Sequence, residues 1–449
     1  MWHTFDSFSF DTAKWRTALN NHHFDTGLPR GVADYLPTRA AMLSFLEQQT
    51  LKVASAWGFQ RFIPPALEFE DVLAIGMGEG LRKRTFRFDD WQSGRLLAIP
   101  PDITPQIARI VATRMKGQPL PHRISYAGRV LRHSELQSGR SREIMQAGVE
   151  LIGLDSPEAD AEMVAMAVEL MQSLRLRDFK VDLGQVAFCQ GIFDESGLTG
   201  EPLGLVREAV ALKDASAVDS LLKRFTVSEQ SRKELQMLPR LFGGCEVLDE
   251  AGRMVKNPRS LTALQNINEV VTILKLHGIE DCLTIDLGET RGLDYHTGLT
   301  FEGFIPGLGE ILFSGGRYDS LTARYGFDSP ATGFTCNLLN LMQALELQGN
   351  MMDEHRDLLV FEASDDKSEA LKISRKLRGL GYSVARDIIR RDLDASLSYA
   401  MQSGIRALLV IEDDDSSDDN RKYRLIHTKD KKEQILSRTQ LWELFTNRG

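Results

Sequence analysis

Cysteine is scarce in this sequence, and its cysteines are not arranged for chemistry. No two of them form a CxxC pair, and none lies near a histidine at the spacing of metal ligands. The 449 residues include four: Cys189, Cys245, Cys282 and Cys336. The pattern argues against a structural zinc site or a dithiol redox motif. We therefore expect buried free thiols in a reducing cytoplasm and no bound metal.

Long apolar runs and an excess of basic residues are also missing. No stretch approaches the roughly 20 apolar residues that cross a membrane. The first residues, MWHTFDSFSFDTAKW, lack the basic segment and apolar segment of a secretory signal. The formal net charge is −9, which disfavours general nucleic-acid binding, because that requires many Lys and Arg residues. We expect a cytoplasmic protein.

The composition that remains is that of an ordinary globular protein, with 42% hydrophobic and 26% charged residues. The length indicates about two or three domains. We expect an irregular N-terminal extension at 1–26 and a core at 27–350, with a helical insertion at about 186–278. Alternating strands and helices predict a small α/β domain at 356–449.

Local signals predict several helices. Thr38 precedes a run of apolar residues at helical spacing and can cap it, and Gly58 would end that helix. Thr104 can cap a second helix that starts with proline, and Ser156 a third. The segment TGFTCNLLNLMQALEL is predicted to be one more helix.

Two strands joined by a polar loop follow the second helix. The strands are HRISYAGRVLR and IMQAGVELIG, and Arg132, Arg140 and Arg142 crowd the loop between them. Guanidinium groups suit a phosphate or carboxylate, although a solvated basic loop explains them equally well. Gln146 and Glu150 are four residues apart in the second strand, so they share one face of a sheet.

Three further segments carry polar residues in tight groups. Asp102 lies just before the second helix and could face a ligand ammonium, although a plain turn acid is the commoner case. TRGLDYHTG contains Arg291 and His296, and FSGGRYDSL contains Tyr318. A metal bound by His296 is disfavoured, because no cluster of His or Cys accompanies it.

Taken in order, these segments resemble the histidyl-tRNA synthetases, which are class II aminoacyl-tRNA synthetases, from about Leu28 to the C-terminus. RGLDY, GGRYD and the arginine-containing loop carry the likeness. The resemblance implies an α+β fold whose core is an antiparallel sheet with a helical insertion, followed by a domain like an anticodon-binding domain. The first helix and IPPALE look like motif 1, which builds the dimer interface in that family.

The resemblance also implies a histidine pocket. The family's residues around the ligand ammonium correspond here to Asp102, Thr104, Gln146 and Glu150. Two acids and an amide provide the acceptors that an ammonium needs. Tyr318 corresponds to a tyrosine that touches the imidazole, and the histidine-specific signature supplies Arg291, Tyr295 and His296.

Three positions depart from the synthetase pattern. Ser134 stands where motif 2 has the glutamate that reads adenine, and Asn340 stands where motif 3 has the arginine that grips the triphosphate. His296 replaces the second tyrosine of the synthetase signature, which weakens the histidine assignment without excluding it. An asparagine cannot replace a guanidinium against a triphosphate, so adenylation is not expected.

A chain that keeps an amino-acid pocket and loses ATP chemistry resembles the regulatory subunits of ATP phosphoribosyltransferase. YHTGLTFEGFIPGLGE and SGGRYD are similar to that family's sequences. This resemblance implies a non-catalytic protein without a cofactor, which binds histidine for feedback control of histidine biosynthesis. The implied partner is a short-form catalytic subunit around a homodimer core, with no role for tRNA. Arg132 and Arg140 leave phosphate binding open.

Two alternatives stay open from the sequence. One is an active histidyl-tRNA synthetase with unusual motifs. The other is a synthetase paralogue with a different partner, an interpretation favoured by the C-terminal domain, because many regulatory subunits lack one.

Overall fold

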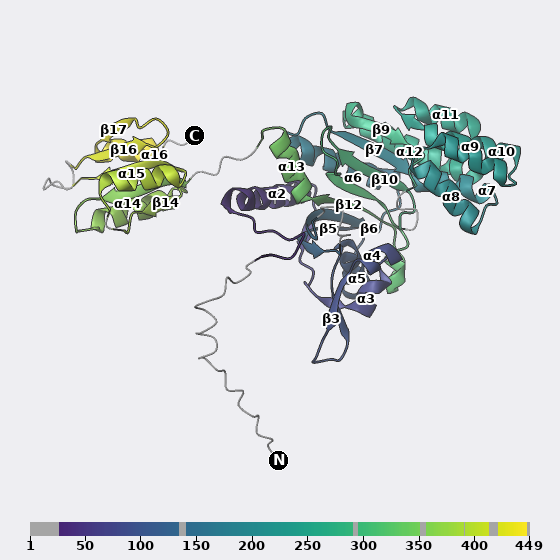
Figure 1. The fold of residues 1–449 in the computed structure, drawn as a ribbon, viewed down its shortest axis with the longest axis horizontal. Helices are drawn as coiled ribbons and strands as arrows, with labels where there is room; N and C mark the ends of the chain where they lie inside the picture. Colours follow the sequence, from purple (N-terminus) through teal and green to yellow (C-terminus); the bar gives the residue numbers. More distant parts are fainter. Residues whose placement is uncertain are drawn as a thin grey trace, which may run out of the picture. The chain divides into compact units, whose positions relative to one another are not determined.

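The computed structural model describes residues 27–133, 141–290, 295–350, 356–389, 391–412 and 421–446. The chain divides into two compact units, Met1–Met351 and Met352–Gly449, and each is described by itself (Figure 1). In the described part of the chain, none of the helices is both long enough and apolar enough to cross a membrane.

A nine-stranded, mostly antiparallel sheet forms the centre of the first unit. Its strands, in spatial order, are β1 (Gln60–Phe62), β5 (His122–Leu131), β6 (Glu143–Ile152), β12 (Ala331–Asn337), β11 (Phe313–Arg317), β10 (Leu299–Phe304), β7 (Lys180–Gln185), β9 (Leu283–Asp286) and β8 (Phe242–Gly243). The parallel neighbours are β1 with β5 and β7 with β9. The predicted α+β class with an antiparallel core is confirmed.

One face of this sheet is apolar and carries the core. Side chains alternate along each strand, so Val149, Phe334 and Phe301 point to the same side and are almost fully buried. The helices α2 (Pro37–Ala56), α6 (Pro157–Ser173) and α13 (Leu338–Leu347) pack against the strands from this side.

The opposite face is polar and partly covered at β5. Helix α5 (Thr104–Arg114) packs there through Ile103, Ile107 and Val111 against Ile124 of β5. A small sheet of β2 (Glu68–Phe69), β4 (Leu96–Ile99) and β3 (Phe86–Asp89) lies beside it, with the short helices α3 (Glu70–Ile75) and α4 (Glu79–Lys83). Arg109 of α5 holds Glu68 of β2 in a nearly buried ion pair at 2.6 Å, which fixes the helix beside the polar face.

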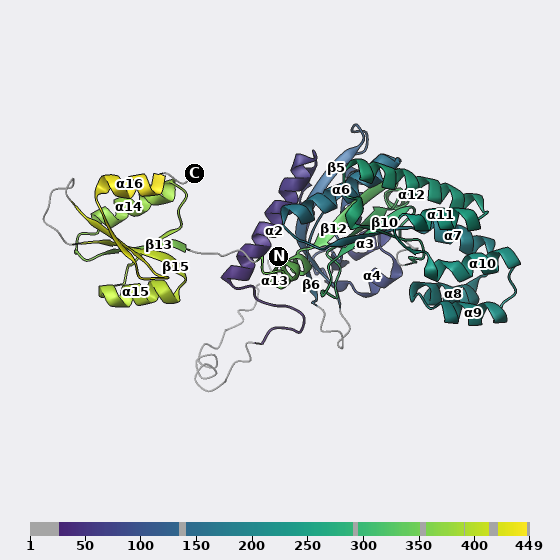
Figure 2. The same cartoon turned by 90° about the horizontal axis from the view of Figure 1, so that it is seen from above.

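A run of helices separates β7 from β9 in sequence. These elements are α7 (Val186–Glu195), α8 (Gly200–Ala211), α9 (Ala215–Arg224), α10 (Glu229–Met237), η1 (Leu238–Arg240), α11 (Glu246–Met254), α12 (Pro258–Leu276) and η2 (Glu280–Cys282), with the short strand β8 between η1 and α11. The side chains of Asp214, Ser228 and Asn257 cap α9, α10 and α12. Figures 1 and 2 show α7 to α11 gathered at one end of the sheet.

The structure confirms some local predictions and corrects others. Ser156 caps α6 as expected, accepting a hydrogen bond from Ala159 N at 3.3 Å. Helix α2 instead starts at Pro37, so Thr38 lies inside it rather than capping it. Residues 331–337, most of them predicted helical, form the central strand β12, because they pair with β6 and β11 on both edges. Tertiary pairing has overridden the apolar helical pattern there.

The second unit is a five-stranded sheet between helices. Its strand order is β14 (Val384–Arg386), β13 (Arg356–Glu362), β15 (Ile405–Ile411), β16 (Tyr423–His427) and β17 (Glu433–Leu436), with helices α14 (Ser368–Gly379), α15 (Leu393–Gln402) and α16 (Arg438–Thr446). The first three strands are parallel and the last two antiparallel, as the alternating pattern predicted in part. The hairpin β16–β17 and α16 are additions that the sequence pattern did not reveal.

Candidate functional site

On the polar face of the large sheet, a row of mostly glycine residues runs across the strands from Glu150. In the strand register, Glu150 lies opposite Gly333, Gly333 opposite Gly316, Gly316 opposite Thr300, and Thr300 opposite Gly184. A Cβ on Gly333 would collide with the Glu150 carboxylate and with the backbone of Val149. The glycine at 333 is therefore required by the close approach of the Glu150 carboxylate.

Glu150 is almost completely buried and is surrounded by hydroxyl groups. Its side chain is 1% exposed. Thr104 Oγ1 donates to its Oε1 at 2.7 Å, Tyr126 OH donates to the same oxygen at 3.0 Å, and Tyr318 OH donates to Oε2. We call Glu150, Thr104, Tyr126 and Tyr318 the pit.

The charge state of the pit follows from its burial. Burial raises the pKa of Glu150 to about 8, although the three hydroxyl donors oppose this shift. Burial also raises the pKa of Tyr126 and of Tyr318, so both remain neutral donors at ordinary pH. At neutral pH the pit is thus a mostly uncharged cage, and a cationic or N–H-donating ligand would favour ionisation of Glu150.

Asp102 and Gln146 form a second layer nearer the solvent. Gln146 Nε2 donates to Asp102 Oδ1 at 3.0 Å, and Gln146 Oε1 accepts from Ile103 N at 3.0 Å. Asp102 Oδ1 also accepts from Thr104 N at 3.2 Å. This clamp fixes the start of α5 to β6, and the Asp102 side chain is 24% exposed.

Thr104 does not cap α5, contrary to the sequence prediction. The N-cap residue is Ile103, which provides no side-chain cap. The Thr104 hydroxyl donates to Glu150 instead, because the sheet brings that buried acceptor within reach. A residue that resembled a helix signal is therefore part of the pit.

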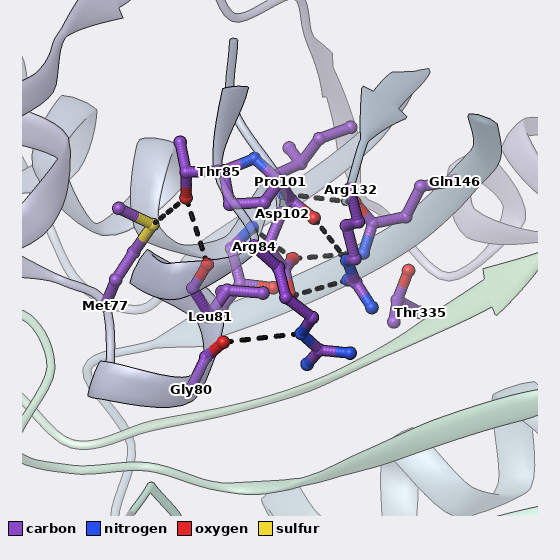
Figure 3. A network of polar contacts seen from close by, with 12 residues as sticks. Met77, Gly80, Leu81, Arg84, Thr85, Pro101, Asp102, Arg132, Gln146 and Thr335 are labelled. Atoms are coloured by element: carbon purple, nitrogen blue, oxygen red, sulfur yellow. Dashed lines mark hydrogen bonds and ion pairs between the residues drawn. The ribbon is translucent and has the colours of Figure 1, made fainter. Parts of the chain in front are cut away.

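Arg132 lies beside Asp102 at the solvent side. Its Nη2 is 3.4 Å from Asp102 Oδ2, and its Nε donates to Pro101 O at 2.7 Å. Figure 3 shows Asp102 contacting both Gln146 and Arg132, with Arg84 extending below them. We call Asp102, Gln146 and Arg132 the mouth. Arg132 can pair with the anionic group of a ligand whose cationic group contacts Asp102.

An aromatic wall continues from the pit. Tyr295 stacks on Tyr318 with ring centroids 5.5 Å apart, and His296 meets Tyr295 edge-on at 5.0 Å. Burial lowers the pKa of His296 to about 4, so its imidazole is neutral, and its Nδ1 lies 3.3 Å from Arg317 O. Stacked neutral rings suit a flat ligand group such as an imidazole.

His296 also lines a neighbouring cavity of about 130 Å³. Acidic residues contribute much of its wall: Asp182, Asp286, Glu289 and Glu302. In the described ranges, no group of three His, Cys, Asp or Glu side chains is placed to hold a metal ion.

The signature GGRYD places Tyr318 through a buried ion pair. Arg317 Nε donates to Asp160 Oδ2 at 3.0 Å, and its Nη1 contacts Asp319 Oδ1 at 3.1 Å. Both Arg317 and Asp160 are nearly inaccessible to solvent. Arg317 therefore acts in the framework that orients the neighbouring tyrosine.

The sequence-predicted residues fall into three groups. The structure brings most of them into one network or against its wall: Asp102, Thr104, Gln146, Glu150, Arg132, Tyr295, His296 and Tyr318. Arg291, Arg140 and Ser134 lie outside the described residues. Asn340 is buried, and its amide donates to Ile311 O at 2.7 Å and accepts from Asn337 at 3.1 Å, so both ends bind neighbouring protein groups.

Tyr126 is the pit residue that the sequence prediction missed. It lies opposite Gly148 in the β5–β6 register, between the positions facing Gln146 and Glu150. The two predicted strands would have placed Tyr126 next to Glu150 if their register had been known. A Cβ on Gly148 would approach Tyr126 OH to 2.8 Å, so the glycine makes room for this hydroxyl.

Comparisons with known proteins agree on one family. The family model described as histidyl-tRNA synthetase matches residues 31–341. The ATP phosphoribosyltransferase regulatory subunit of Geobacter sulfurreducens is 58% identical over 393 residues, covering 87% of this chain and 90% of the relative. The protein of the same name from Acetivibrio thermocellus is 35% identical over 389 residues, covering 86% of this chain and 93% of its own.

Solved structures show the same fold. A Bacillus halodurans structure described as an ATP phosphoribosyltransferase regulatory subunit/histidyl-tRNA synthetase has a TM-score of 0.77 and 26% identity, covering 87% of this chain and 99% of that one. The histidyl-tRNA synthetase of Nostoc has a TM-score of 0.81 at 21% identity, covering 95% and 100%, which supports the fold alone.

The alignment with the Geobacter relative is longer than the first unit, which ends at Met351, so it extends into the second unit. At least part of the C-terminal unit is therefore shared with a relative that carries the regulatory-subunit name. On the extent and identity of these matches, the chain belongs to the family of ATP phosphoribosyltransferase regulatory subunits, which share the histidyl-tRNA synthetase fold.

Proposed function

We propose that this chain is a non-catalytic regulatory subunit of ATP phosphoribosyltransferase, and that it binds histidine for feedback control of histidine synthesis. Relatives at 50% and 58% identity carry that name. One observation carries the ligand assignment: a buried carboxyl, Glu150, sits among three hydroxyl donors next to the Asp102–Gln146 pair. Such a pocket fits a small amino acid with a polar ring.

The pocket offers complementary groups for each part of histidine. Asp102, Gln146, Thr104 and Glu150 provide oxygen acceptors for the ammonium group. Tyr318 and the stacked Tyr295 provide an aromatic wall for the imidazole. Arg132 at the mouth suits the carboxylate.

This arrangement selects against ligands that leave the buried groups unpaired. An unsatisfied buried donor or acceptor costs about 1–3 kcal/mol, so an analogue without the ammonium or the ring binds more weakly by that amount for each lost contact. Leucine keeps the ammonium and carboxylate groups but has no ring nitrogens, so it loses the contacts that the imidazole makes.

Regulation requires more than binding. Histidine changes the activity of a catalytic partner only if it binds two states of the assembly with different affinity. The proposed partner is a short-form catalytic subunit assembled around a homodimer of this chain, and tRNA has no part in the assembly.

Isothermal titration calorimetry with histidine tests the proposal, both for the chain alone and with the catalytic subunit. Histidine is expected to bind, histamine more weakly because it lacks the carboxylate, and imidazole propionate weakest because it lacks the ammonium. Glu150→Ala should abolish the inhibition of the complex by histidine. No heat at millimolar histidine in either sample would contradict the proposal, as would equal binding of imidazole propionate.

Synthetase activity is the second candidate, favoured by the family match over residues 31–341 and by Arg132 at the mouth. Histidine-dependent exchange of pyrophosphate into ATP distinguishes it from the first. We expect no exchange, because Asn340 stands at the position of the triphosphate arginine and its amide is engaged by Ile311 and Asn337. A robust exchange rate would replace our proposal with this alternative.

A further inference from the structure

The segment that follows β9 is held by the helical insertion through an ion pair. Asp286 ends β9 and is largely buried. Lys213, at the corner between α8 and α9, contacts its Oδ1 with Nζ. The backbone N–H of Gly288 donates to the same oxygen at 3.0 Å. The Asp286 carboxylate therefore joins the insertion to the turn that starts after β9.

Other parts of the insertion hold the same turn. Leu287 N donates to Leu241 O at 3.0 Å, and Cys189 Sγ donates to Leu287 O at 2.8 Å. A Cβ on Gly288 would collide with Leu238 O and approach Lys213 Nζ to 2.8 Å. Residues 286–288 thus fit closely between α7, the α8–α9 corner and the η1–β8 segment.

The turn leads by a short stretch of chain to the aromatic wall. Thr290 is buried, and Tyr295, five residues later, stacks on Tyr318. Tyr318 in turn donates to Glu150. Asp286 and Glu289 of the turn line the cavity of about 130 Å³ that His296 also lines, and His296 meets Tyr295 edge-on. A shift of the insertion that moves the turn therefore moves the cavity wall beside the aromatic wall of the pit.

Lys213 has an unusual backbone for its role at the corner. Its φ is 56°, in the left-handed region that non-glycine residues seldom adopt. A lysine occupies this position with its ammonium on a mostly buried carboxylate, whereas a glycine would fit the backbone with less strain. The ion pair made by its side chain, rather than the turn geometry, therefore explains why a lysine occupies position 213.

We propose that Lys213 is a positioning residue that couples the helical insertion to the ligand pocket, so that the placement of the insertion sets the affinity of the pocket. The identity of the ligand as histidine rests on the proposed function, but the coupling does not. It predicts that movement of the insertion, for example against a partner subunit, changes the affinity without any contact to the ligand.

Hydrogen exchange without ligand tests the coupling directly. In Lys213→Met, which keeps the length and removes the charge, peptides covering 295–298 should exchange at least about threefold faster than in the unaltered chain, because local opening becomes easier. Lys223→Met, an exposed lysine at the end of α9, is the matched control and should leave these peptides unchanged. Unchanged exchange at 295–298 in a folded Lys213→Met protein would overturn the inference.

Histidine titration of a mutant cycle provides the second measurement. Lys213→Met and Asp286→Asn should each weaken histidine binding by about five- to tenfold, and the double variant by no more than either single one, since the two residues act as a pair. Lys213→Arg keeps the positive charge and should therefore retain most of the affinity of the unaltered chain. Additive losses, or a Lys213→Met protein with unaltered affinity, would contradict the coupling. If the unaltered chain binds no histidine, the proposed function fails while the exchange experiment still decides the coupling.

Discussion

The pit and the mouth recognise a ligand by different physical means. The pit holds a carboxyl of about 1% exposure among neutral hydroxyls, whereas the mouth holds the ion pair of Asp102 with Arg132, in which about a quarter of each side chain is exposed. In the pit, every interaction is strengthened by burial and every mismatch is costly. At the mouth, solvent and salt weaken the same kinds of contact. We therefore expect the pit to supply specificity and the mouth to supply modest affinity.

Filling the space at Gly333 should break the pit most severely. In Gly333→Ala the new methyl group collides with the Glu150 carboxylate, so the carboxylate has to leave its hydroxyl donors. We expect histidine affinity to fall by at least about 100-fold and stability by about 1–3 kcal/mol, as for other overpacked positions. Calorimetry and thermal unfolding measure the two effects. Gly309→Ala is the control, because its Cβ would meet no atom within 4 Å; equal losses in both variants would contradict the argument.

Removing the charge of Glu150 should weaken binding and abolish its pH dependence. With a pKa of about 8, Glu150 is mostly protonated at pH 7, and a bound ammonium requires its carboxylate. Histidine affinity should therefore rise about tenfold per unit between pH 6.5 and 7.5, with nearly one proton released. Glu150→Gln should bind about 10- to 100-fold more weakly at pH 7.5 and release no proton. Calorimetry in buffers of different ionisation enthalpy counts the protons; release by the variant would exclude Glu150 as their source.

The same carboxyl should make the free energy of unfolding fall as the pH rises, whereas histidine affinity rises. The pKa of Glu150 is raised by folding, from 4.5 to about 8, so its contribution is full below pH 4.5 and is lost as the pH rises through 8. Between these values the unaltered chain should lose up to about 1.4 kcal/mol per pH unit relative to Glu150→Gln. Urea unfolding of both proteins at pH 5.5, 6.5 and 7.5 measures the difference. A constant difference across this range would show that Glu150 titrates normally.

Deleting the hydroxyl of Tyr126 should have a smaller effect. Tyr126→Phe removes one of three donors to Glu150 and leaves the ring in place, so we expect about a fivefold loss of affinity, the value of one hydrogen bond of about 1 kcal/mol. Tyr325→Phe is the control, because its hydroxyl contacts the backbone oxygens of Val72 and Leu73 at 3.4 and 3.5 Å rather than Glu150. Equal binding by Tyr126→Phe and the unaltered chain would remove Tyr126 from the site.

Sequence patterns predicted what depends on neighbouring residues and missed what depends on strand pairing. The cap at Ser156 and the shared face of Gln146 and Glu150 need only local geometry. The hydroxyl of Thr104 has a local use as a cap and a distant one at Glu150, 46 residues away, and the buried acid takes it. To predict Tyr126 as a site residue, the register of β5 against β6 has to be known. The family resemblance indicated Thr104 for the site, but Tyr126 was missed, so the chemistry of the pit could be predicted from sequence only in part.

Neutralising Arg132 should have the smallest effect and the strongest salt dependence. Arg132→Met removes a guanidinium that is about a quarter exposed and 3.4 Å from Asp102, so we expect affinity to fall only about two- to fivefold, as for other solvent-exposed ion pairs. The loss should shrink further in 0.5 M salt, because the ions screen the same charge that the variant lacks. The matched test is Glu150→Gln, whose deficit should persist at high salt, since the pit is buried. If both deficits respond equally to salt, the pit and the mouth do not differ in the way their burial implies.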